Sequence, residues 1–220
     1  MTGEGRTVDI GKYRLLEMRR HLLLIVVAGV VVWLWAASPT WGSFGLALVL
    51  IVVGVAMTAL PAIAFGAAGR KPPRAVLALF PVVMFELLRV GLVTWAALDA
   101  AEAAWMGLWT AFVMSAGMLV TVKASFHLNA ADPDGKDMTR EHPGPLLAPR
   151  RLLRDVAGIC HDVACCLLVA WSPWLVLVTI AQGSAEGLLK DDSTGQTWVK
   201  IVGGFALLTL ALFLWLRMSA

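Results

Sequence analysis

The sequence predicts an all-α protein, a polytopic transmembrane bundle of about six helices with both termini in the cytoplasm. Hydrophobic residues make up 59% of the 220 residues, whereas soluble domains contain about 45–50%. Charged residues make up 15%, against about 25% in soluble domains. The apolar residues form long continuous runs, and basic residues gather in alternate loops. This excess of apolar surface needs lipid as its solvent.

Each long apolar run is interpreted as a helix because backbone groups in lipid must hydrogen-bond within their own segment. A span needs roughly 20 apolar residues, and a β-barrel would show shorter alternating segments. The chain is expected to form one membrane domain, 1–220, with a cytoplasmic loop at 128–155. The predicted spans cover residues 21–37, 43–68, 75–97, 105–127, 156–180 and 198–216.

The first predicted span follows a basic segment that contains Arg14, Arg19 and Arg20. A secretory signal peptide also carries basic residues before an apolar stretch. Here the basic segment is long, and the apolar run ends in Trp33 and Trp35 rather than in small residues. We therefore expect the first span to be retained as a helix that begins early, at the membrane interface.

The orientation of the spans follows from lysine and arginine, which concentrate on the cytoplasmic side of membranes. In the six-span arrangement 15 of the 18 basic residues fall on one side. Nine of the ten tryptophans fall on the other side, and only Trp215 lies at the inner boundary. The expected location is the plasma (inner) membrane of a bacterium, with the lipid bilayer as the first partner.

The most informative polar residues are Glu86 and Arg89, which form a predicted intramembrane charge pair. Glu86 lies about eleven residues into its span, near the middle of the bilayer at about 1.5 Å per residue. The i, i+3 spacing places Arg89 on the same helix face. Ionisable groups at this depth are costly and indicate a functional site by default, although a structural pair that holds helices together is an equally simple interpretation.

A second polar site is expected at His161 and Asp162 in the span 156–180. Cys165 follows His161 at i+4 and Cys166 follows Asp162 at i+4, so each pair shares a helix face. A histidine and a cysteine supply only two ligands, whereas structural zinc sites need four. The sequence therefore predicts no metal site, and the three cysteines, of which Cys160 is the third, are interpreted as reduced packing residues.

Three histidines, His21, His127 and His161, lie near the predicted cytoplasmic ends of their spans. A membrane haem needs two such side chains on facing helices. No neighbouring spans can be established from the sequence, so haem stays an alternative and no other cofactor is expected.

Small residues recur every four positions along two predicted spans. Such stripes let helices approach closely. They indicate helix packing here, and the residues concerned are Gly54, Thr58, Ala62, Gly66, Gly107, Ala111 and Ser115.

Two classes of function follow. We favour a non-catalytic subunit or scaffold of a larger membrane complex, assembled with other membrane proteins or with itself, because no catalytic constellation is found. The alternative is a small transporter or channel-like protein that uses Glu86 and Arg89, and a haem-binding electron-transfer subunit is a further one. An enzyme is less favoured. The net charge of +3 is accounted for by orientation and does not indicate nucleic-acid binding.

Overall fold

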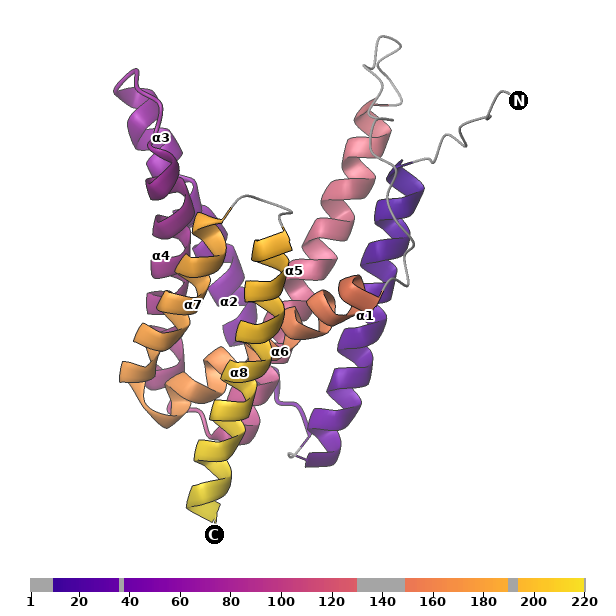
Figure 1. The fold of residues 1–220 in the computed structure, drawn as a ribbon, viewed down its shortest axis with the longest axis vertical. Helices are drawn as coiled ribbons and strands as arrows, with labels where there is room; N and C mark the ends of the chain where they lie inside the picture. The colour runs from indigo at the N-terminus through magenta and orange to yellow at the C-terminus, as the bar shows by residue number, and fades with distance from the viewer. Residues whose placement is uncertain (1–9, 36–37, 130–148, 190–193, 220) are drawn as a thin grey trace, which may run out of the picture.

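The computed structural model describes residues 10–35, 38–129, 149–189 and 194–219, with side chains for 15–35, 38–120, 149–189 and 194–217. Every regular element in this part of the chain is helical, which confirms the predicted fold class (Figure 1). The elements are α1 Ile10–Trp35, α2 Trp41–Thr58, α3 Leu60–Ala67, α4 Arg74–Trp95, α5 Ala100–Asn129, α6 Pro149–Trp171, the 3-10 helix η1 Pro173–Leu175, α7 Val176–Leu188 and α8 Thr194–Ser219.

Four segments in the described part are long and apolar enough to cross a membrane. They are Trp41–Ala67, Arg74–Trp95, Ala100–Val120 and Thr194–Arg217. Only 17% of the most apolar window of Arg74–Trp95 and 22% of that of Thr194–Arg217 are buried inside the protein. Helices that expose so much apolar surface are compatible with a lipid environment. The six predicted spans are not confirmed as a set.

The predicted span 156–180 is two helical segments with a break between them rather than one helix. α6 ends at Trp171, and Ser172 is extended with φ −154° and ψ 122°. Pro173 explains the break, because a proline disfavours the α conformation of the residue before it. The chain reverses there and continues through η1 into α7, which runs back beside α4 (Figure 1).

This reversal changes the predicted sidedness of the last loop. Arg74 Nη2 donates to the Leu189 carbonyl at 3.5 Å, and Arg150 Nη2 donates to the Thr194 carbonyl at 3.3 Å. The end of α7 and the start of α8 therefore lie at the end of the molecule that carries the basic residues, not at the opposite end. α1 begins at this charged end, whereas α8 finishes at the other (Figure 1), so the predicted placement of both termini on one side is not confirmed.

The tryptophans gather at the end opposite the charged end, which we call the tryptophan end. The rings of Trp171 and Trp215 meet edge to face with centroids 5.7 Å apart, so Trp215 belongs here and not at the opposite boundary. Trp198, close to the start of α8, lies at the charged end instead. Nine of the ten tryptophans therefore lie at one end, as predicted, but Trp215 is among them and Trp198 is not.

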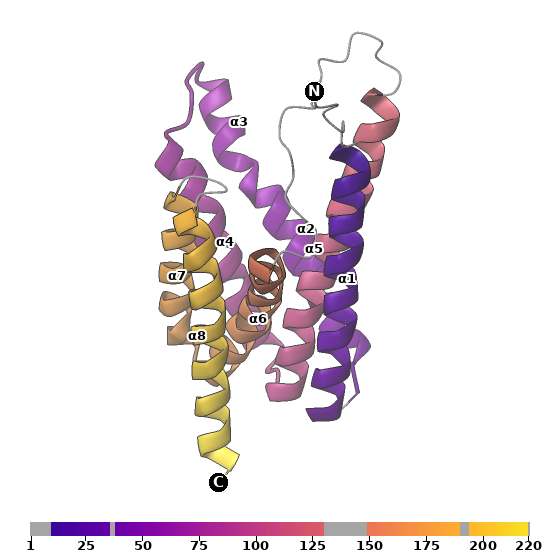
Figure 2. The same ribbon diagram turned by 45° about the vertical axis from the view of Figure 1, so that its right-hand side comes forward.

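α6 is the central helix of the bundle. It runs obliquely across the other helices in Figure 1 and lies between α8 and α5 in Figure 2. Seven consecutive residues, Val163 to Val169, are buried. Glycines allow the close packing: a Cβ on Gly107 of α5 would lie 2.5 Å from the Asp162 carbonyl oxygen, and one on Gly204 of α8 would lie 2.3 Å from that of Ala157.

α6 also begins earlier than predicted. The sequence places residues 149–155 in the cytoplasmic loop, whereas in the structure they form the start of the helix. Pro149 is its first residue, a position where the missing N–H of proline costs nothing. The remainder of the predicted loop lies mostly outside the described residues.

Candidate functional site

Glu86 and Arg89 are in contact on the inner face of α4. Arg89 Nη1 donates to Glu86 Oε1 at 2.7 Å, and both side chains are buried. The helix places them one turn apart on one face, as the i, i+3 spacing predicts. α4 directs this face toward α6 and α7 rather than toward lipid.

Two residues from other helices complete the cluster. Arg89 Nη2 lies 3.4 Å from Asp162 Oδ1 of α6, and the Thr179 hydroxyl of α7 donates to Glu86 Oε2 at 2.8 Å. Asp162 is thus a second carboxylate beside Arg89, which the sequence interpretation of α4 did not include. We define Glu86, Arg89, Asp162 and Thr179 as the ion cluster.

Arg89 is the largest fully buried side chain, at 1% exposure. Its guanidinium also lies 5.5 Å from the centre of the Phe85 ring, a cation–π contact. Nε of Arg89 has no hydrogen-bond partner among the described residues. A buried unpaired donor costs free energy, so this arrangement of Arg89 is less stable than a fully paired one.

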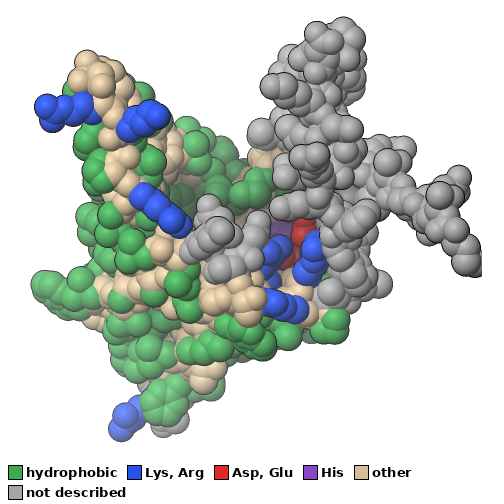
Figure 3. Space-filling view, turned by 45° about the horizontal axis from the view of Figure 1, so that its top comes forward, with side chains coloured by type: hydrophobic (Ala, Val, Ile, Leu, Met, Phe, Trp, Pro, Cys, Tyr) green, Lys and Arg blue, Asp and Glu red, His purple; other side chains and the backbone are tan. Residues whose placement is uncertain are grey.

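A cavity of about 680 Å³ lies next to the ion cluster. Its lining includes four acidic side chains, three basic ones and two histidines, set among apolar residues such as Val82, Met114 and Met118. Gly158, Gly183 and Gly187 are in the lining, and Gly183 lets α7 pack closely on α4, since a Cβ there would lie 2.7 Å from Val82 Cγ1. Figure 3 shows acidic and histidine side chains within a hollow at the charged end, bordered by lysine and arginine.

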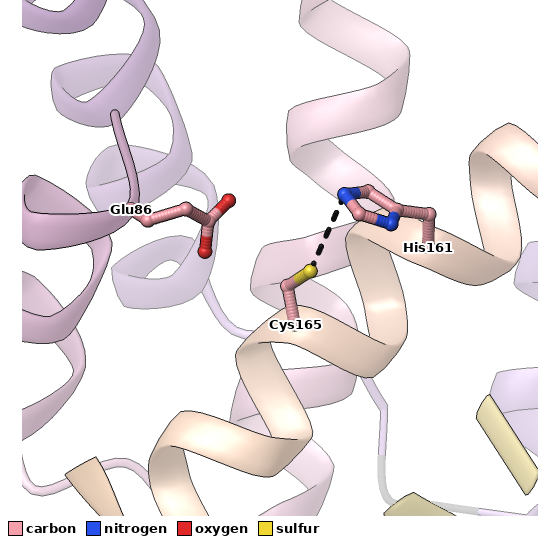
Figure 4. Close-up of side chains that lie close together, drawn as sticks. All are labelled: Glu86, His161 and Cys165. Carbon is pink, nitrogen blue, oxygen red and sulfur yellow. Dashed lines mark hydrogen bonds between the residues drawn. The ribbon is translucent and has the colours of Figure 1, made fainter. Parts of the chain in front are cut away.

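His161 and Cys165 of α6 lie opposite Glu86 of α4 (Figure 4), and Glu86 and His161 line the cavity. His161 Nε2 lies 3.5 Å from Cys165 Sγ. One ligand atom from each of the three residues lies within 4.8 Å of the other two. His161 and Asp162 are therefore both at the site, on neighbouring positions that meet different partners.

A second charged group joins the start of α6 to α1. Asp155 forms an ion pair with Arg20 and lies 3.9 Å from His21 Nδ1, while Glu17 lies 3.5 Å from Arg154 Nη2. Burial raises the pKa of Asp155, but its contacts with His21 and Arg20 outweigh burial and hold the pKa below the ordinary value of 3.8. These contacts fix the α6 N-terminal turns against α1.

The two small-residue stripes differ in how they pack. In the stripe on α5, Ala111 and Ser115 are buried and Gly107 contacts α6. In the stripe that begins on α2, a Cβ on Gly54 would lie 2.5 Å from the Phe85 ring, but α2 ends at Thr58 and the last two members lie beyond the break, on α3. Those two, Ala62 and Gly66, are exposed.

The histidines considered for haem are partly brought together. His21 and His161 line the same cavity from α1 and α6. The side chain of His127 lies outside the described residues. Haem ligation by the first two stays a prediction.

Thr179 and the orientation of Asp162 were not anticipated from the sequence. The available signal was Pro173: a proline in the middle of an apolar run indicates a break, and the break brings Thr179 back to α4. Asp162 and Arg89 are 73 residues apart in the sequence, and no local pattern relates them.

No family model, curated protein or solved structure matches this chain. Its function is therefore argued from the cavity and the ion cluster.

Proposed function

We propose that this protein is a membrane transporter or channel-like protein that admits a small polar or ionic solute through the charged end and binds it beside the ion cluster. The observation that carries the proposal is the cavity of about 680 Å³ whose lining brings together seven charged side chains and two histidines and includes buried Glu86 and Arg89. Ionisable groups inside membrane bundles commonly mark solute pathways.

The electrostatics of the cavity support a charged or zwitterionic solute. Lys200 and Glu186 form an ion pair at 3.3 Å at its wall, and both side chains are partly exposed. At its inner end Arg89 is held by two carboxylates and still has the unpaired Nε. A solute can exchange its hydration for these fixed groups, which is how polar sites are formed in a low-dielectric interior.

The test is electrogenic uptake by purified protein in liposomes on a solid-supported membrane. The panel comprises monovalent and divalent cations, phosphate, mono- and dicarboxylates, and amino acids. We expect at least one class to give a saturating current that Glu86→Gln abolishes. Phe213→Leu, on the outer face of α8, is the matched control and should leave the current unchanged. Folded protein that gives no current with any class overturns the proposal.

A second candidate, the subunit or scaffold, is favoured by the tryptophan end. Trp41, Trp95 and Trp174 are each at least 80% exposed there. Tryptophan is enriched at protein interfaces as well as at membrane interfaces. Purification in mild detergent separates the two functions, since a stoichiometric partner bound at this end supports the scaffold. An absorption spectrum of the same sample tests the haem alternative.

A further inference from the structure

We propose that Glu86, His161 and Cys165 form a binding site for a divalent transition-metal ion such as Zn²⁺ at the inner end of the cavity. The proposal rests on the proposed function, because it names the class of ion that the cavity would admit. Its basis is the convergence of three different donor types from two helices, with ligand atoms all within 4.8 Å of one another (Figure 4).

The spacing of the donors fits a shared ion. Two donors on a tetrahedral zinc lie about 3.3–3.8 Å apart, from Zn–N and Zn–S bonds of about 2.0–2.3 Å. The His161 Nε2 to Cys165 Sγ distance is 3.5 Å. The distances from the Glu86 carboxylate to the ligand atoms of His161 and Cys165 do not exceed 4.8 Å. A movement of the carboxylate by about 1 Å therefore brings these distances into the range of a tetrahedral zinc.

Glu86 can accept a metal without losing its present contacts. Its Oε1 accepts from Arg89 and its Oε2 accepts from Thr179. Each of these bonds uses one lone pair, and an ionised carboxylate offers about four. Arg89 and Thr179 then hold the carboxylate in place, in the role that outer partners have at metal sites.

The charges of the region balance when the ion is bound. Glu86, Asp162 and a Cys165 thiolate supply three negative charges. Arg89 and a divalent ion supply three positive charges. On binding, the sulfur–metal bond replaces the S–H bond, and the thiol proton leaves to water through the cavity. Without a metal Cys165 stays a thiol, and its contact with His161 is an ordinary one within a helix.

The donor set favours zinc-like ions over hard ones. Thiolate and imidazole suit Zn²⁺, Co²⁺ and their neighbours, whereas Mg²⁺ and Ca²⁺ prefer oxygen ligands. Three protein ligands leave one position open, as in zinc sites that exchange water or a substrate. That open position and the polar lining of the cavity are what an ion in transit requires.

The experiment is titration of the purified, metal-free protein with Co²⁺, followed by absorption and by competition with Zn²⁺. We expect one equivalent of Co²⁺ to bind with a thiolate-to-cobalt charge-transfer band, and Zn²⁺ to displace it. Cys165→Ser should remove the band, and His161→Gln should weaken Co²⁺ binding by about 10-fold or more. Cys166→Ser is the matched control, because Cys166 is equally buried yet lies outside the donor group, and it should keep the band.

Each outcome decides one of the two proposals. Absence of the band in folded protein, or its survival in Cys165→Ser, overturns the metal site. If another solute then gives currents, the transport proposal stands without it. A Cys165-dependent band in a protein that passes no solute supports a resident metal centre and overturns transport. The serine variants keep the size of the side chain, so their folding can be checked by gel filtration beside the control.

Discussion

α6 and α8 pack against each other at the glycine contact between Gly204 and Ala157, yet they face different surroundings. α8 exposes Val202, Phe213 and Leu216 on its outer side. α6 is enclosed by α1, α4, α5, α7 and α8, and carries Asp155, His161 and Asp162. The helix with the exposed apolar side is one of the candidate membrane spans, and the enclosed helix holds these three ionisable groups.

The difference shows how this bundle accommodates charge. A charged side chain facing lipid at mid-depth costs about 2.5–3.5 kcal/mol on insertion scales. Asp162 avoids that cost because Arg89 lies 3.4 Å away and other helices cover it. The following changes test how sharply the two environments differ, in order of decreasing effect.

The arrangement of α6, α7 and α8 is tested by an all-or-none labelling experiment. In a chain whose three cysteines are replaced by serine, Lys71→Cys and Thr194→Cys should react with an impermeant thiol reagent from the same side. Thr40→Cys should react only from the opposite side, because it precedes α2 at the tryptophan end. Thr194→Cys reacting together with Thr40→Cys would restore the six-span arrangement and remove α6 from its enclosed position.

Breaking the ion cluster should have the largest effect on stability. Arg89→Leu leaves two buried carboxylates without their cation and should lower the free energy of unfolding by about 3–5 kcal/mol in mixed micelles. Glu86→Gln should lower it less, because Arg89 keeps its contact with Asp162. Glu86→Leu with Arg89→Leu should recover only part of the loss, because Asp162 is then left without its cation. Adding Asp162→Asn should recover more. Purely additive losses would mean that the three groups are not coupled.

The contact between α6 and α1 should contribute less. Asp155→Asn removes the charge that meets Arg20 and His21, and we expect a loss of about 1.5–3 kcal/mol at pH 7. The folded pKa of Asp155 is lowered, so its contribution is present above the unfolded pKa of about 3.9 and is lost as pH falls through the folded pKa. The difference in the free energy of unfolding between the parent and Asp155→Asn should therefore decrease only below about pH 4. A difference that stays constant from pH 7 to pH 3 would contradict this assignment.

The close approach of α5 to α6 gives a test with a built-in control. Gly107→Ala places a methyl group 2.5 Å from the Asp162 carbonyl oxygen, and the helices must separate, at a cost of about 1–3 kcal/mol. Gly91→Ala on α4 meets nothing within 4 Å. Its better helix propensity should raise stability by up to about 1 kcal/mol. Thermal unfolding of the two variants should shift in opposite directions, and a shift of the same sign would argue against this packing.

The outer face of α8 should be the most tolerant region. Phe213 is 58% exposed, and Phe213→Leu keeps an apolar side chain toward lipid. The free energy of unfolding should change by no more than about 0.5 kcal/mol. A larger loss would show that this face is covered by another protein rather than by lipid, and would sharpen the case for a membrane complex.

The sequence by itself determined the helical class, the four apolar helices that are long enough to cross a membrane and the pairing of Glu86 with Arg89. These properties depend on composition and on spacings of three or four residues, which a helix converts directly into neighbours. The concentration of tryptophan at one end was also visible, although Trp198 and Trp215 were placed at the wrong ends. Both errors have one source, the helix predicted to continue through Ser172.

Only the tertiary structure decided what surrounds that pair. Pro173 turns the chain, α7 returns to α4, and Thr179 reaches Glu86, a residue 93 positions earlier. α6 crosses the bundle because Gly107 and Gly204 allow its backbone to come close to α5 and α8. Asp162, His161 and Cys165 thereby face α4, and the space beside them becomes the cavity. Contacts of this kind join residues far apart in the chain, and they form because buried charges must find partners wherever the packed helices bring them.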